Sequence, residues 1–313
     1  MSTVLSAILY ILLLQPYALA YEDFESRNLQ TIQSIYNLTV YPNFLPIIAN
    51  GSAAIPPGLF NPNATGRITP LGNFTGFEDS IEYFFALAPT PQGTSGKAIY
   101  AAEVVEFTSG CPSVAASVVY LKIGQVDPTT GGLINGTSSG TTTTAKQVRS
   151  SLPFADPTVA FWNFDDDGQV LRYDAWLPNL QRWNSILLGA NFDDPPAQDA
   201  FRRTLCPAVQ QRCSGPNRQY DSEEDCVADL AAKPFGNYDE AWGDNIACRT
   251  IHVILAQIRP EIHCPHVGPN GGDGPDNYKC VDIDYSTEYF ADEKLYRDPE
   301  GVPFTCPGED YSY

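Results

Sequence analysis

The cysteines are the strongest constraint on how this chain can fold. Seven of the eight come after residue 200, in a region that is rich in Gly and Pro and has few long apolar runs. An even number of cysteines favours a disulfide framework, and each bond typically contributes about 2–4 kcal/mol to stability. We therefore expect disulfides to stabilise this region, with these residues paired: Cys111, Cys206, Cys213, Cys226, Cys248, Cys264, Cys280 and Cys306.

The seven C-terminal cysteines cannot all pair among themselves. A free thiol is usually avoided in an oxidising compartment, so we expect Cys111 to pair with one of them. That bond would attach the C-terminal region to the turn at Gly110-Cys111-Pro112 and make the two halves one unit. The sequence does not identify the partner, because eight cysteines allow many connectivities.

The N-terminus has the pattern of a secretory signal peptide. Val4–Leu14 is a short apolar run, and Ala18-Leu19-Ala20 is a small-x-small cleavage site. The run is too short to span a bilayer comfortably. We expect residues 1–20 to be removed and the protein to be secreted. A retained membrane anchor is the alternative, because no Lys or Arg precedes the run.

Glycosylation motifs and charge agree with an extracellular protein. The chain has five N-x-Ser/Thr acceptors, all before residue 140. They are Asn37, Asn50, Asn63, Asn73 and Asn135. The formal net charge of −19 makes nucleic acids and anionic membrane surfaces unfavourable partners, because an acidic surface repels phosphate groups.

The first half predicts two helices and a sheet. Apolar residues recur at helical spacing over residues 21–41 and 75–87, while residues 42–76 are rich in Pro, Gly and Asn and predict mostly loop. Residues 99–107 and 113–123 are rich in β-branched and aromatic side chains and predict two strands.

The clearest pattern is a second hairpin. Val159–Phe164 and Gln169–Leu177 flank the acidic turn Asp165-Asp166-Asp167-Gly168, which ends in the Asp-Gly pair typical of hairpin turns. A short closing helix is expected over residues 178–187.

This order of elements, with the hairpin FWNFDDDGQVLRYDAWL, resembles the SnoaL-like, nuclear-transport-factor-2-like family over residues 24–187. The resemblance implies an α+β cone, in which a curved antiparallel sheet wraps onto helices and encloses a pocket. The fold hosts isomerases, cyclases, dehydratases and non-catalytic binders, so it does not imply one activity. Cone-type domains often form homodimers through the open sheet face.

We therefore expect three segments. Residues 1–20 form the signal peptide, residues 21–190 the cone domain, and residues 191–313 a cysteine-rich, helical and irregular domain that packs on the cone. The C-terminal region resembles no family that we can name from its sequence. Helices are expected there over residues 196–205, 222–232 and 239–258.

All three histidines fall in residues 243–280. His252 lies on the last expected helix, and His263 and His266 lie in the turn that follows it. Three neutral imidazoles from a helix and the next turn could converge on Zn²⁺ or Cu²⁺. The alternative is that the histidines are hydrogen-bonded scaffolding in a disulfide-dense region.

The last strand of the hairpin supplies candidates for the cone pocket. Arg172, Asp174 and Trp176 share one face of a regular strand, and Asp174 could act as a general base if burial raises its pKa. The alternative is a solvent-facing Arg-Asp pair or a polar contact with the C-terminal region. The ligand-binding candidates are Arg172, Trp176, Trp162 and Tyr173.

The leading function hypothesis is binding of a small molecule or carbohydrate in the cone pocket. An extracellular metal-dependent enzyme that uses the three histidines is the first alternative, and a structural extracellular protein is the second. The sequence therefore leaves open whether the protein is an enzyme.

Overall fold

The computed structural model of the chain describes residues 24–91, 96–134, 154–274, 277–282 and 304–306. The expected signal peptide and the acceptor Asn135 lie outside these residues. The other four acceptor asparagines, at positions 37, 50, 63 and 73, are exposed, as glycosylation requires. Within the described ranges, no helix is both long enough and apolar enough to cross a membrane.

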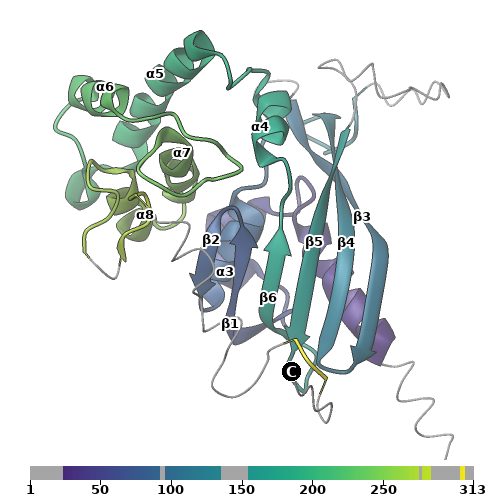
Figure 1. Cartoon of the computed structure of the whole chain (residues 1–313). Coiled ribbons are helices and arrows are strands. Elements are labelled where there is room, and N and C mark those ends of the chain that lie inside the picture. Colours follow the sequence, from purple (N-terminus) through teal and green to yellow (C-terminus); the bar gives the residue numbers. More distant parts are fainter. Residues whose placement is uncertain (1–23, 92–95, 135–153, 275–276, 283–303, 307–313) are drawn as a thin grey trace, which may run out of the picture.

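A curved six-stranded sheet forms the centre of the first half, in the order β2-β1-β6-β5-β4-β3 (Figure 1). Neighbouring strands are antiparallel except for β1 and β6, which are parallel. The α+β fold class is therefore confirmed, but the expectation of a wholly antiparallel sheet was wrong at this pair. The strands are β1 (Phe60–Thr69), β2 (Gly72–Thr75), β3 (Gly96–Cys111), β4 (Val114–Val126), β5 (Phe154–Phe164) and β6 (Val170–Trp176).

Strands β1 and β2 lie in a stretch for which the sequence predicted mostly loop. β1 reads FNPNATGRIT, which lacks the β-branched alternation of an ordinary strand. Its pairing with β6 shifts register between Phe60 and Thr65, around Pro62, which has no N–H to donate. The neighbouring strands, and not local propensity, hold this segment extended.

The helices of the first half pack against one face of the sheet around Trp162. The first helix runs through residues 24–38, and its Tyr36 ring meets Trp162 edge-on, with ring centroids 5.9 Å apart. Phe84 stacks on the same indole at 6.0 Å. The other helical elements of this half are α2 (Leu45–Asn50), η1 (Gly51–Ala54), α3 (Phe77–Ile81), the π-helical turn η2 (Glu82–Ala86) and α4 (Leu180–Leu188).

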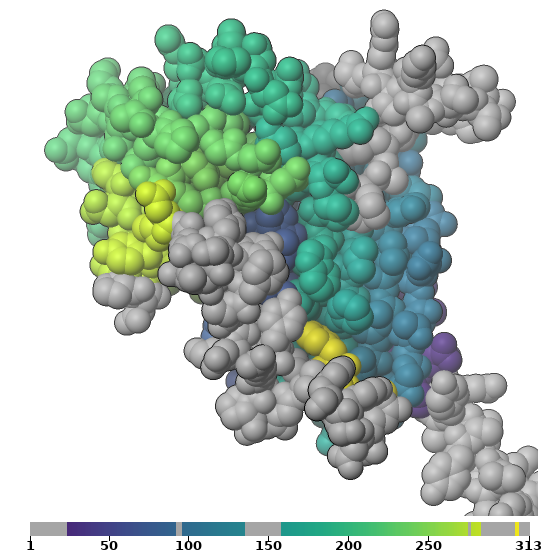
Figure 2. Space-filling model, viewed as in Figure 1, coloured from purple at the N-terminus to yellow at the C-terminus, as the bar shows by residue number. Residues whose placement is uncertain are grey.

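The C-terminal helices form a group at one side of the sheet, near β1 and β2 (Figure 1). Figure 2 shows this group in direct contact with the sheet half. Trp242 Nε1 donates to the carbonyl of Leu71 over 2.7 Å, so the group contacts the turn between β1 and β2. Its elements are α5 (Pro195–Arg212), η3 (Gly215–Asn217), α6 (Glu223–Ala232), α7 (Ile246–Leu255) and α8 (Pro260–Val267).

All eight cysteines are paired, and Cys111 joins a C-terminal cysteine as expected. Three bonds lie within the C-terminal region: Cys206–Cys226, Cys213–Cys264 and Cys248–Cys280. The fourth is Cys111–Cys306, which attaches the far end of the chain to the β3–β4 turn. None of the four disulfides joins helices α5 to α8 directly to the sheet, so non-covalent contacts position these helices on it.

A buried ion pair joins β1 to β6. The parallel register places Arg67 beside Asp174, and the guanidinium donates to both carboxylate oxygens over 3.1 and 2.8 Å. The two side chains are 3% and 2% exposed. The sequence placed Asp174 beside Arg172, because it did not predict β1 and could not reveal the true partner.

We expect Asp174→Asn to lower the free energy of unfolding by about 3–5 kcal/mol, because it removes the carboxylate that pairs with a buried guanidinium. Chemical denaturation under non-reducing conditions measures this loss. Asp199→Asn is the matched control, since Asp199 is 67% exposed in its pair with Arg202 and should cost less than about 1 kcal/mol. Equal losses in the two variants would contradict the prediction.

Candidate functional site

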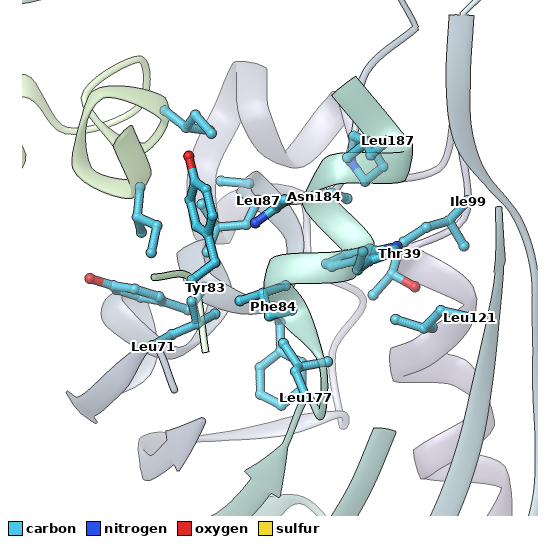
Figure 3. Close-up of a pocket in the computed structure, with 18 of the residues that line it drawn as sticks. Thr39, Leu71, Tyr83, Phe84, Leu87, Ile99, Leu121, Leu177, Asn184 and Leu187 are labelled. Atoms are coloured by element: carbon cyan, nitrogen blue, oxygen red, sulfur yellow. The ribbon is translucent and has the colours of Figure 1, made fainter. Parts of the chain in front are cut away.

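An apolar cavity of about 600 Å³ lies between the sheet, η2, α4 and α7 (Figure 3). This volume falls in the range of sites that bury a small organic molecule. Aliphatic and aromatic side chains from well-separated parts of the chain form its walls. They include Leu71, Phe84, Leu121, Leu177, Leu187 and Ile254.

The C-terminal helices complete this cavity. Thr250, Ile251 and Ile254 of α7 line it, together with Tyr238 from the loop before α7. The sheet half supplies the floor and the other walls. The cavity is therefore not a property of the cone alone, and the position of the helical group determines its shape.

Four buried polar atoms in the cavity wall have no hydrogen-bond partner within the described part of the chain. They are Tyr36 Oη, Thr158 Oγ1, Trp183 Nε1 and Tyr238 Oη. Burial also raises the pKa of Tyr36, so its hydroxyl stays protonated and can donate. An unpaired buried polar group costs about 1–3 kcal/mol, so these atoms favour a bound molecule that pairs with them.

Among the described residues of the cavity wall, the two charged ones are both cations. Lys97 donates to the carbonyl of Ile186 in the last turn of α4, and Arg212 donates to the carbonyl of Val253 over 2.7 Å. Burial lowers the pKa of both side chains. The cavity edge therefore offers positive charge to an acidic or electron-rich group of a ligand.

The five pocket residues expected from the hairpin do not line this cavity. Alternation along β6 was predicted correctly, but the cavity lies on the opposite face, where Ala175 and Leu177 contribute. Trp176 instead meets Phe161, which is 41% exposed. Arg172 also lies outside the lining. Both carboxylate oxygens of Asp174 accept hydrogen bonds from Arg67, so Asp174 is engaged in the ion pair and does not face a ligand.

Trp162 and Tyr173 are buried beneath the cavity wall. Trp162 Nε1 donates to Ser117 Oγ over 2.9 Å, and Phe84 covers both rings. They support the wall and do not contact its interior.

The three histidines converge in the helical group, which the sequence analysis left open beside a role as hydrogen-bonded scaffolding. His252 projects from α7, while His263 and His266 project from α8, a helix that was expected to be a turn. Pro260 caused that error, because the sequence analysis took it as the end of a helix, whereas α7 ends at Leu255 and Pro260 is the first residue of α8. The Nδ1 atom of His252 lies 3.3 Å from His263 Nδ1 and 3.2 Å from His266 Nδ1.

The Nε2 atoms of His263 and His266, which point away from the centre of the cluster, each form a hydrogen bond with a side-chain oxygen. His263 Nε2 lies 2.8 Å from Glu82 Oε2, and His266 Nε2 lies 2.8 Å from Asn277 Oδ1. The amide nitrogen of Asn277 donates to Asp273 over 2.6 Å, so its oxygen faces the ring. Both imidazoles therefore donate from Nε2, and the neutral form of each presents its Nδ1 lone pair to the centre of the cluster.

Burial favours the uncharged forms of His252 and His266. Desolvation lowers the pKa of His266 to about 4, and it holds the pKa of His252 well below the usual range, with the other two rings adding to the effect. Burial alone would raise the pKa of Glu82, but its hydrogen bonds with His263 and Arg259 outweigh this and lower it. Glu82 therefore stays ionised beside His263.

Tyr83 connects the two sites. Its ring lines the cavity and meets His252 and His263 edge-on, with ring centroids 6.5 and 6.3 Å apart. Sequence reasoning missed both Tyr83 and the adjacent Glu82. A glutamate within the aromatic run EYFFA was the available signal, because a carboxylate on an apolar helix face needs a buried partner.

Comparison with known proteins identifies relatives over most of the chain. The bifonsecin B biosynthesis cluster protein A of Aspergillus brasiliensis is 30% identical over 289 residues, covering 87% of this chain and 86% of the relative. Residues 190–282 match the BfoA family C-terminal domain. The chain therefore belongs to the BfoA family, which also identifies the C-terminal region that the sequence left without a family.

A second relative is the aurasperone B biosynthesis cluster protein A of Aspergillus niger. It is 28% identical over 270 residues, which cover 80% of this chain and 78% of the relative. The relatives are thus biosynthesis cluster proteins.

Similar solved structures include a SnoaL-like candidate polyketide cyclase from Jannaschia, which is 14% identical and has a TM-score of 0.32. The match covers 52% of this chain and 93% of that protein. A ketosteroid isomerase-like protein from Erwinia carotovora atroseptica is 10% identical and has a TM-score of 0.28. The match covers 50% of this chain and 96% of that protein. Likeness at these scores says nothing about the ligand or reaction of this chain.

We expect Tyr36→Phe to leave the free energy of unfolding of the ligand-free protein unchanged or to raise it by up to about 1 kcal/mol, because it removes an unpaired buried hydroxyl. Tyr41→Phe is the matched control. Tyr41 is also buried, but its hydroxyl donates to the carbonyl of Pro128 over 2.5 Å, so its loss should cost about 1 kcal/mol. A similar loss in both variants would mean that Tyr36 has a partner in the free protein.

Proposed function

We propose that the protein binds a small, mainly apolar organic molecule in the cavity between the cone and the C-terminal helices. The observation that carries this proposal is the combination of apolar walls with the unpartnered Tyr36, Thr158 and Trp183 atoms. Apolar walls give affinity by burial, and a few placed polar atoms select the orientation of the ligand. A carbohydrate fits less well, because each of its hydroxyls would need a partner here.

The relatives support a ligand of biosynthetic origin. Both are named for the clusters that make bifonsecin B and aurasperone B. A protein from such a cluster meets small organic products or their precursors, and a ring-bearing compound with hydroxyl or carbonyl oxygens would match the cavity. Lys97 and Arg212 would favour a compound with an acidic group.

Binding accounts for the cavity better than the two alternatives. Of the residues described in the cavity wall, none is a carboxylate or an imidazole that could act as a general base. A purely structural role does not explain a cavity with unpaired polar atoms. The expected homodimer stays a prediction, because a single chain does not test it.

We also propose that binding takes place outside the cell. The signal-peptide pattern, four disulfides and the exposed acceptor asparagines support this location. Secretion of the full chain with cleavage near Ala20, read by N-terminal sequencing of the mature protein, tests it. Retention in the cytosol with reduced cysteines would contradict it.

The cavity can be tested with anilinonaphthalene sulfonate, an aromatic anion whose fluorescence rises in apolar sites. We expect one saturable site per chain and a loss of affinity of about tenfold or more in Leu121→Trp, because Leu121 faces the cavity and the larger ring fills it (Figure 3). Tyr120→Trp is the control, since Tyr120 is 39% exposed and next in sequence. Equal affinity in the three proteins would refute binding in the cavity.

The role of Thr158 can be tested with the same dye or with an identified ligand. Thr158→Val keeps the shape of the side chain and removes the unpaired hydroxyl, so the free protein should be as stable as before or more stable. For a ligand with a hydrogen-bonding oxygen, we expect a loss of affinity of about threefold to tenfold. A ligand without such an oxygen should bind both proteins equally, and unequal binding would contradict this role.

A further inference from the structure

In the histidine cluster, the Nδ1 lone pairs that face one another outnumber the N–H groups available to donate to them. His263 and His266 donate from Nε2 to Glu82 and Asn277, so the neutral form of each ring directs a lone pair from Nδ1 toward His252 Nδ1. His252 Nδ1 can carry one proton and satisfy one of them. At least one buried lone pair then faces another nitrogen without a donor between them.

A metal ion satisfies all three lone pairs at once. We propose that His252, His263 and His266 bind one zinc ion through their Nδ1 atoms. This site is separate from the organic-ligand cavity and does not depend on the function proposed for it. The three rings are 3%, 3% and 1% exposed, so the site is part of the interior and not a surface cluster.

The spacing of the nitrogens favours zinc over copper. Two ligands at about 2.0–2.1 Å from a tetrahedral zinc ion stand about 3.3 Å apart, whereas adjacent ligands in a square-planar site would stand about 2.9 Å apart. The two separations in the cluster are 3.3 and 3.2 Å. Both match the tetrahedral arrangement.

The surroundings resemble those of known metal-binding histidines. Such rings almost always donate their other nitrogen to a carboxylate or carbonyl oxygen, which fixes the tautomer and orients the ring. Glu82 and the Asn277–Asp273 pair play this part for His263 and His266. Arg259 in turn holds Glu82 over 2.5 and 2.6 Å, so the supporting carboxylate is itself fixed.

Covalent bonds set the geometry of the site before any metal binds. Cys248–Cys280 joins α7, one turn before His252, to the segment that carries Asn277, and Cys213–Cys264 attaches α8 next to His263. These cysteines cannot compete as thiolate ligands while they are paired. The histidines are also the only ones in the chain, so no other imidazole can bind metal.

The test uses the full secreted chain with its disulfides intact and without a polyhistidine tag. Metal is removed with a chelator, the protein is dialysed, and ZnCl₂ is titrated by calorimetry while elemental mass spectrometry counts bound zinc. We expect one zinc per chain. Co²⁺ in place of zinc should give the intense visible absorption of a tetrahedral site in which three of the four ligands are nitrogens.

Two variants separate the site from general folding. His252→Ala removes the ligand that both other rings face, and it should abolish stoichiometric binding. Asn277→Leu leaves all three ligands in place and removes only the acceptor for His266, so we expect zinc affinity to fall about 10–100-fold. Because Asn277 is only partly buried, this variant should fold normally by circular dichroism.

Absence of stoichiometric zinc binding by the folded, chelator-treated wild-type chain at micromolar metal would overturn the proposal. Unchanged binding in a folded His252→Ala variant would do the same, because the metal would then sit elsewhere. If His252→Ala does not fold, the Asn277→Leu affinity decides. Full affinity in that variant would exclude the arrangement described here.

Discussion

The contact of Glu82 with Arg259 and His263 is the interaction on which the relation between the two halves depends. Glu82 belongs to the sheet half, and its partners belong to the C-terminal helices. Burying a carboxylate is costly, so it persists only where opposite charge and hydrogen bonds compensate. Arg259 supplies the charge and also reaches Asp79 over 2.6 Å. This buried polar contact fixes α8 against η2.

The same contact determines the wall of the cavity. Glu82 begins the π-helical turn η2, and the next two residues, Tyr83 and Phe84, both line the cavity. π-helical turns are rare and are frequent at functional sites. Here the turn brings a buried carboxylate toward α8 and two adjacent rings toward the ligand space. A displacement of α8 would therefore move η2 and, with it, the Tyr83 and Phe84 rings in the cavity wall.

Local patterns in the sequence were sufficient for some elements and insufficient for others. The β5–β6 hairpin was predicted because alternation and the Asp-Gly turn lie within one short stretch. β1 was not, because its strand conformation comes from neighbours more than a hundred residues away, as its pairing with Arg172 and Asp174 shows. Alternation placed Asp174 and Ala175 on opposite faces, but no local signal says which face a distant helix will cover. Cysteine parity likewise predicted a bond from Cys111 without identifying Cys306.

The bond between Cys111 and Cys306 closes a covalent ring with a sequence separation of 195 residues. Strands β4 to β6 and every C-terminal helix belong to that ring. One peptide-bond cleavage anywhere inside it opens the ring but does not divide the molecule. A protein nicked once there would migrate as a single species until its disulfides are reduced. Intact mass under oxidising conditions would then show only the addition of one water molecule.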